Sequence, residues 1–170
     1  MGKKIEEARV TNVHFNENQI LDWFTQICLA LKHVHDRKII HRDLKTTNIF
    51  LTKENTIKLG DFGMATVLNN TFANAKTIIG SPYYLSPEIV DNKPYNMKTD
   101  IWSLGVILYE LCALTPPFNG NNLNYLALKI VRGSYAQLGP YVSKDIKNLV
   151  GALLNTETNK RPNINDILSN

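Results

Sequence analysis

The residues best suited to chemistry lie in two polar segments of this chain. They read His41-Arg42-Asp43-Leu44-Lys45-Thr46-Thr47-Asn48 and, thirteen residues after Asn48, Asp61-Phe62-Gly63. The Asp43 carboxylate would accept or orient a hydroxyl proton, and Lys45 would place positive charge near a transferring phosphate. Asn48 and Asp61 offer the amide and carboxylate oxygens that Mg²⁺ prefers. This combination is typical of Mg²⁺-dependent phosphoryl transfer.

Each of these residues alone would be interpreted as part of a turn, because Asp and Asn favour turns. Their joint order and spacing favour the chemical interpretation instead. The histidines outside these segments give no comparable signal. His14, His33 and His35 show no spacing with Cys, Asp or Glu that is typical of metal ligands, and we expect ordinary surface or core residues there.

Short β-type runs and helical periodicity predict the elements around these segments. Ile49-Phe50-Leu51 and Ile57-Lys58-Leu59 are separated by polar residues and predict a small hairpin. Residues 99–114 are apolar nearly all round and predict a buried central helix that ends at Pro116-Pro117. Residues 60–85 show no sustained period, and a loop of this length is usually functional.

The remaining helices are predicted from caps and apolar stripes. Asn16 with Gln19 forms a capping-box pattern before a stripe that runs from Ile20 to Val34. Further helices are expected at residues 3–10, after Ser86 with Pro87 in the first position, at 123–131 closed by Gly133, after Ser143, and after Pro162. The predicted fold class is therefore mainly α with one small β-hairpin.

Composition indicates an ordinary globular protein. The chain has 170 residues, 44% hydrophobic content and a net charge of +4, and its Lys and Arg residues are scattered, so we expect no nucleic-acid partner. The apolar stretch 101–114 is too short to span a bilayer, so we expect no membrane association. Cys28 and Cys112 lie in apolar helical runs and predict buried thiols, which suits a reducing, cytoplasmic compartment.

The ordered motifs resemble those of the protein kinase superfamily. The 41–48 run, Asp61-Phe62-Gly63 and Ser86-Pro87-Glu88 follow one another in the kinase order, and Lys45 two residues after Asp43 is similar to the serine/threonine type. The runs 80–88 and 92–96 resemble the NIMA-related kinases, with Ser86 and Asn92-Lys93-Pro94-Tyr95-Asn96 as the most telling points.

The resemblance implies a protein-kinase-like fold with the whole chain, residues 1–170, as its larger C-terminal lobe. Residues 41–48 would be the catalytic loop and 61–88 the activation segment. Only forty residues precede His41, and they contain no G-x-G-x-x-G loop and no strand lysine, so we expect the small N-terminal lobe to be absent. We therefore expect weak or no activity from the chain alone. The apolar surface that would face the small lobe would then favour aggregation, or a protein partner that covers it.

The resemblance also implies the ligands and the substrate class. ATP and Mg²⁺ would be the cofactors, and the substrates would be proteins with Ser or Thr acceptors. Phe50 would form the floor under the adenine ring. The remaining nucleotide and metal contacts would come from Lys45, Asn48 and Asp61, with Asn48 and Asp61 as the metal ligands.

Other residues would have regulatory roles by the same resemblance. Arg42 would pair with a phosphate on the activation segment. Thr77 stands where activating phosphorylation usually falls, with Thr66, Thr71 and Ser81 as neighbouring alternatives. Ser81 would lie near Asp43 and keeps the hydroxyl of the more usual Thr.

A further set of residues would have structural roles. His41 and Phe62 would stack on each other. Glu88 would form a buried ion pair with Arg161. Asp100, at the start of the central helix, would bond to the backbone of the catalytic loop.

Three interpretations of function follow. The first is the catalytic lobe of a NIMA-related serine/threonine kinase. The second is a non-catalytic short form that acts as a binding or decoy module, and the third is a remnant that does not fold stably. The expected location is cytoplasmic, with a nuclear, centrosomal or ciliary location as the alternative that the resemblance adds.

Overall fold

The fold is known from a computed structural model, which describes residues 1–67 and 82–169. Thr77 and Ser81, for which regulatory roles were predicted, lie outside the described residues. Helices and strands follow in the order α1 (Gly2–Thr11), α2 (Glu17–His35), β1 (Ile39–Ile40), η1 (Thr46–Asn48), β2 (Ile49–Leu51), β3 (Ile57–Leu59), β4 (Thr66–Val67), η2 (Pro82–Tyr84), α3 (Pro87–Val90), α4 (Lys98–Ala113), α5 (Leu123–Arg132), α6 (Lys144–Leu153), η3 (Thr158–Lys160) and α7 (Ile164–Leu168). The predicted fold class is confirmed.

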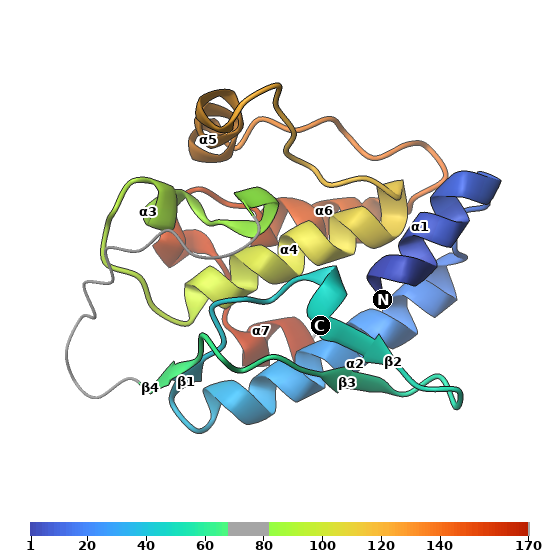
Figure 1. The fold of residues 1–170 in the computed structure, drawn as a ribbon, viewed down its shortest axis with the longest axis horizontal. Coiled ribbons are helices and arrows are strands. Elements are labelled where there is room, and N and C mark those ends of the chain that lie inside the picture. Colours follow the sequence, from blue (N-terminus) through green and yellow to red (C-terminus); the bar gives the residue numbers. More distant parts are fainter. Residues whose placement is uncertain (68–81, 170) are drawn as a thin grey trace.

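Helix α4 is the centre of the molecule. Thirteen of its sixteen residues are buried, which explains why its sequence is apolar nearly all round. It packs against α6 and α2, and Figure 1 shows α2 and the β2–β3 hairpin on one side of it, with α3 and α5 on the other. The helix ends at Ala113 with Leu114 in the left-handed conformation, before the two prolines that were expected to end it.

Most helix ends follow the predicted capping chemistry. Asn16 Oδ1 accepts from the Gln19 amide at 2.8 Å, and Ser143 Oγ accepts from the Ile146 amide at 3.3 Å. Gly133 closes α5 with φ of 62°, a left-handed conformation that favours glycine. Helix α7 begins at a reciprocal capping box between Asn163 and Asp166.

Ser86 departs from its predicted capping role. Pro87 does begin α3, but the Ser86 side chain makes no cap hydrogen bond. Its hydroxyl is instead buried without a hydrogen-bond partner among residues 1–67 and 82–169. Both thiols are buried and free as predicted, and burial raises the pKa of Cys28 and of Cys112 to about 12. Within the described residues, every helix is too short or too polar to cross a bilayer.

The predicted hairpin forms and is fixed to α2. Strands β2 and β3 pair antiparallel with Ile49 opposite Leu59. Gln26, on α2, accepts from the Ile57 amide at 2.9 Å and donates to the Asn55 carbonyl at 3.3 Å. These two bonds fix the turn of the hairpin and the start of β3 against the helix.

A second antiparallel ladder was not predicted. Ile39 and Ile40 of β1 pair with Val67 and Thr66 of β4. This ladder holds residues 66 and 67, which follow the Asp61-Phe62-Gly63 segment, beside the residues that lead into His41. The two polar segments singled out in the sequence are therefore joined at both ends, by β2–β3 pairing and by β1–β4 pairing.

Candidate active site

Asp43, Lys45 and Asn48 form one hydrogen-bonded group. Lys45 Nζ donates to Asp43 Oδ2 at 2.7 Å, and Asn48 Nδ2 donates to the same oxygen at 2.9 Å. The Asn48 amide also donates to the Asp43 carbonyl at 2.9 Å. The 41–48 loop is followed at once by β2, which gives Asn48 a rigid support. The Asp43 carboxylate is thereby oriented by two donors on its own loop.

Asp100 holds the beginning of this loop. Its carboxylate is buried at the start of α4, where the helix dipole favours negative charge. Oδ2 accepts from the His41 amide at 2.9 Å and Oδ1 accepts from the Arg42 amide at 3.0 Å, as the resemblance implied. Arg42 has φ of 70°, and such a left-handed conformation costs a non-glycine residue about 1–2 kcal/mol. The two bonds to Asp100 offset that cost.

Asp61 lies next to this group through the backbone. The Gly60 amide donates to the Asn48 carbonyl at 2.9 Å, and Gly60 directly precedes Asp61. Asp61 is exposed and left-handed, with φ of 60°, and its Oδ1 accepts from the Gly63 amide at 3.3 Å. The segment is thus placed beside Asn48 with its carboxylate facing solvent.

His41 and Phe62 contact each other as expected. Their ring centroids are 4.7 Å apart, and the ring planes are tilted by 52°, so the contact is not a parallel stack. His41 Nε2 also lies 3.2 Å from the Gly60 carbonyl. These contacts tie the two polar segments together at their side chains.

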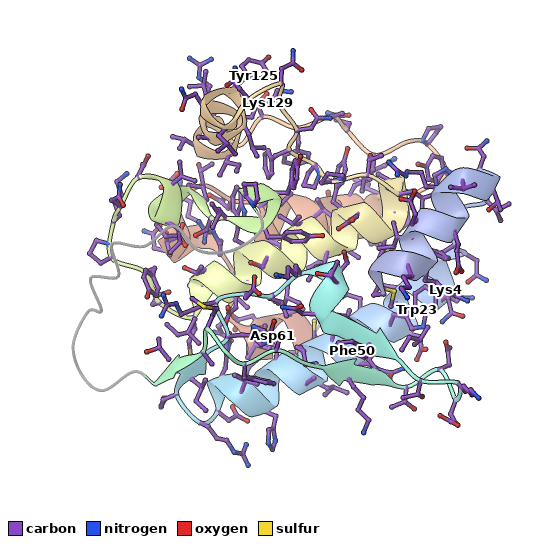
Figure 2. The ribbon with its side chains drawn as sticks, in the orientation of Figure 1. Lys4, Trp23, Phe50, Asp61, Tyr125 and Lys129 are labelled. Carbon is purple, nitrogen blue, oxygen red and sulfur yellow. The ribbon has the colours of Figure 1, made fainter. Side chains whose placement is uncertain are left out.

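Phe50 lies on β2 with 55% of its surface exposed. Figure 2 shows Phe50 and Asp61 along the hairpin side of the molecule. The Phe50 ring covers Gly60 so closely that a Cβ there would lie 2.5 Å from Phe50 Cε2. Glycine is therefore required at this position if the ring keeps its place. The exposed ring offers a flat apolar surface beside the Asp61 segment.

Sequence reasoning missed a second network beneath the loop. Thr46 Oγ1 lies 2.9 Å from the Tyr84 hydroxyl, which donates to Glu110 Oε2 on α4. Burial raises the pKa of the Glu110 carboxyl and that of the Tyr84 phenol. The network links the 41–48 loop to η2, and no periodicity or spacing in the sequence signals it.

The predicted pair of Glu88 and Arg161 is present and bidentate. Arg161 Nη1 and Nη2 donate to Glu88 Oε1 and Oε2 at 2.8 and 2.7 Å, and Thr99 Oγ1 donates to Oε1 at 2.9 Å. Burial acts to raise the pKa of Glu88, but the bonds from Arg161 outweigh it and the pKa lies below its ordinary value. The pair fixes α3 against the start of α4 and the segment before α7.

Arg42 has an aromatic partner that the sequence did not reveal. Its guanidinium lies 5.3 Å from the centre of the Tyr95 ring, within the range of a cation–π contact. Tyr95 is itself buried. Thr77, the predicted phosphorylation site, lies outside the described residues, so the pairing of Arg42 with a phosphate stays a prediction.

The donor atoms near Asn48 suit Mg²⁺ bound together with phosphate. Asn48 uses its amide nitrogen on Asp43, and its Oδ1 accepts no hydrogen bond within residues 1–67 and 82–169. Asp61 adds an exposed carboxylate. One carboxylate and one amide oxygen, completed by phosphate and water, are typical of a Mg²⁺–nucleotide site. The described part of the chain holds no cluster of three or more His, Cys, Asp or Glu residues suited to a metal.

Comparison with known proteins identifies the family. A model of the protein kinase domain matches residues 1–170. The chain belongs to the protein kinase family. This kinase chain is 58% identical to mouse serine/threonine-protein kinase Nek1 over 154 residues, which is 91% of the chain and 13% of that protein.

Two further relatives carry Nek names. Human serine/threonine-protein kinase Nek5 is 56% identical over 167 residues, which is 98% of the kinase chain and 23% of that protein. The probable serine/threonine-protein kinase nek3 of Dictyostelium discoideum is 48% identical over 169 residues, 97% of the chain and 15% of that protein. The predicted resemblance to NIMA-related kinases is confirmed at the level of the domain. The kinase chain spans less than a quarter of the length of each of these three relatives.

Proposed function

We propose that the chain is the C-terminal lobe of a NIMA-related serine/threonine kinase, which transfers the γ-phosphate of ATP to Ser or Thr hydroxyls of proteins. The observation that carries this proposal is the group formed by Asp43, Lys45 and Asn48. A carboxylate oriented by a cation and an amide, next to an exposed Asp61, is the arrangement that phosphoryl transfer needs. The Nek relatives support the substrate class.

Each residue would act from the position it has in the structure. Asp43 would orient the acceptor hydroxyl and take its proton, since its carboxylate is already held by two donors. Lys45, 2.7 Å from Asp43, would bring positive charge toward the transferred phosphate. Asn48 and Asp61 would hold Mg²⁺, and Phe50 would support the adenine ring. Bound Mg²⁺ neutralises charge on the phosphate oxygens of ATP.

The isolated 170-residue chain should nevertheless be slow. Residues 1–40 contain neither a glycine-rich loop nor a strand lysine to cover and hold the phosphates. Loss of one such electrostatic group costs on the order of 10²–10³ in rate. We therefore expect weak or no phosphotransfer from the chain alone, far below that of a two-lobed kinase.

A second candidate function is a binding module. It is favoured by the exposure of Phe50 and Phe62, which are 55% and 45% accessible and lie on neighbouring segments. Exposed aromatic surface of this kind favours a protein partner. A cytoplasmic location and protein substrates with Ser or Thr acceptors belong to the first candidate and remain proposals.

Phosphotransfer from ATP–Mg²⁺ to a serine peptide by the purified chain tests the proposal. Asp43→Asn is the control, because it keeps the shape of the side chain and removes the base. Transfer that falls by about 10² or more in Asp43→Asn would support the kinase. Transfer that survives the substitution would reject the role of Asp43. A folded chain with no transfer would indicate that the lobe alone is an incomplete enzyme and would favour the binding module.

A further inference from the structure

The segment between α4 and α5 contains the single Asn-Gly pair of the sequence, Asn119-Gly120. Asn119 is exposed, and neither residue belongs to a helix or strand. Phe118, directly before the pair, is fully buried and stacks on Trp102 with ring centroids 5.3 Å apart. Asn122, two residues after the pair, is the N-cap of α5. The pair therefore lies at the surface between two fixed points of the chain.

The backbone nitrogen of Gly120 is available for a reaction with the neighbouring side chain. Neither Asn119 nor Gly120 donates a backbone hydrogen bond within residues 1–67 and 82–169. Attack of the Gly120 nitrogen on Asn119 Cγ closes a cyclic imide, and such an intramolecular step has a high effective concentration. Glycine has no Cβ to hinder the approach. The fold also requires glycine here, because a Cβ at Gly120 would lie 2.8 Å from the Leu126 amide nitrogen.

Lys129 is placed to activate the Asn119 side-chain amide. Its Nζ donates to Asn119 Oδ1 at 3.2 Å and lies 5.0 Å from the centre of the Tyr125 ring. Figure 2 shows Tyr125 and Lys129 together on α5. Negative charge develops on Oδ1 when a nitrogen adds to Cγ, and a cation already fixed at that oxygen lowers the barrier.

We propose that Asn119 is a site of spontaneous deamidation that Lys129 promotes. The Gly120 nitrogen forms a bond to Asn119 Cγ, the bond from Cγ to Nδ2 breaks, and the proton of the Gly120 amide leaves with Nδ2 as ammonia. Water then opens the imide at one of its two carbonyls, which gives aspartate or isoaspartate at position 119. The reaction consumes only water, and it uses no residue of the candidate active site. Its test is therefore independent of the proposed kinase function.

Deamidation would change the outer surface of α5. It replaces a neutral amide with a carboxylate that faces Lys129, and it lowers the net charge of +4 by one unit. Isoaspartate also lengthens the backbone of the segment that leads into α5. Leu123, Tyr125 and Leu128 are exposed on this helix, so the new charge lies beside an apolar surface. The modified and unmodified chains would therefore present different surfaces to a partner.

The first experiment is incubation of the purified chain at physiological temperature, followed by fragmentation mass spectrometry that separates isoaspartate from aspartate. We expect both products at position 119. Asn121 is the internal control, because it is also exposed but is followed by Asn122 instead of glycine, and it should stay unmodified. Asn119→Gln, in which the ring would be larger, should also stay unmodified. A folded chain that stays unmodified while the urea-unfolded chain converts would overturn the proposal, and so would equal conversion at Asn121.

The second experiment tests the role of Lys129. Lys129→Met keeps an unbranched side chain and removes the cation, and we expect it to slow conversion of Asn119 about two- to fivefold in the folded chain, the effect of one charge near the surface. In urea the two chains should convert at equal rates, because Lys129 is no longer held at Asn119. Lys129→Arg should retain most of the rate.

Lys4→Met is the matched control for net charge. Lys4 is exposed on α1, well away from Lys129 in Figure 2, and its loss should leave the conversion of Asn119 unchanged. An equal or faster conversion in folded Lys129→Met would show that the bond to Oδ1 does not promote the reaction, and would overturn the proposal. The same slowing in urea, or in Lys4→Met, would also overturn it, because the effect would not then come from the folded contact.

Discussion

Removal of the Glu88 charge should destabilise the chain strongly. In Glu88→Gln the amide oxygen retains one bond from Arg161 and the bond from Thr99, but the new NH₂ group faces the second guanidinium donor. The variant thus loses one charge-assisted bond and leaves the Arg161 cation buried without its counter-charge. We therefore expect a loss of stability. The size of this loss depends on the other contacts that Arg161 keeps in the variant.

Breaking a buried ion pair by removing one partner costs about 3–5 kcal/mol. Arg161 retains bonds to the carbonyls of Asn155 and Lys98, at 2.6 and 2.9 Å, and lies 5.1 Å from the Trp102 ring. These contacts offset part of the loss. The expected decrease in the free energy of unfolding is therefore at the lower end, about 3 kcal/mol.

Urea unfolding followed by tryptophan fluorescence measures this decrease. The matched control is Glu157→Gln, which removes the same charge from an exposed pair with Lys160 at 2.6 Å. The control should change the free energy of unfolding by at most about 1 kcal/mol. A loss below about 1 kcal/mol in Glu88→Gln, or one equal to the control, would refute the assignment of a stabilising role to this charge.

Three further predictions concern packing and pH. Gly105→Ala should lower the free energy of unfolding by about 1–3 kcal/mol, because the new Cβ would lie 2.8 Å from Leu153 Cβ. Thermal or urea unfolding measures this change, and an unchanged free energy would contradict the close packing of α4 on α6. Gly151→Ala in α6 should raise the free energy of unfolding by about 0.5–1 kcal/mol, because alanine favours a helix more than glycine does. The site has room for the new Cβ, since its nearest atom would be the Tyr135 hydroxyl at 3.9 Å. A decrease in the free energy of unfolding would contradict this prediction. Because the folded-state pKa of Glu88 lies below its ordinary 4.5, the contribution of its carboxylate to stability is complete above that value and is lost as pH falls through the folded pKa. The unmodified chain should therefore lose more stability than Glu88→Gln between about pH 6 and about pH 3.5, and parallel losses would contradict the lowered pKa.

Regular elements followed from the sequence where periodicity was sustained. The apolar surface of α4, the cap at Asn16 and the short β-type runs of β2 and β3 each carry a local signal, and the structure contains all three. The ladder of β1 with β4 carried none, because strands of two residues are too short to show a period. The capping role of the Ser86 hydroxyl was wrongly predicted because it depends on tertiary surroundings, which bury this hydroxyl without a partner in the described part of the chain.

The residues of the candidate site could be predicted from the sequence, but most of the side chains that hold the 41–48 loop in place could not. Asp43, Lys45 and Asn48 are close in the chain, so their spacing already implied that they meet. His35, Asp100 and Tyr84 come from different helices, and their contacts with the 41–48 loop depend on how those helices pack. The bond of Asp100 to the loop was expected only through family resemblance. Spacing in one sequence cannot indicate which distant side chain will complete a buried hydrogen-bond group.

The bond from Gln26 to the hairpin has a consequence for self-association. A two-stranded ladder exposes backbone donors at its outer edge, and such an edge can recruit a strand from another molecule. The Gln26 side chain takes the Ile57 amide and donates to the Asn55 carbonyl, so it fills the place that a neighbouring strand would occupy. One glutamine on a helix thereby protects the small sheet from edge-to-edge pairing, a function that larger proteins often give to a proline, a charge or a bulge.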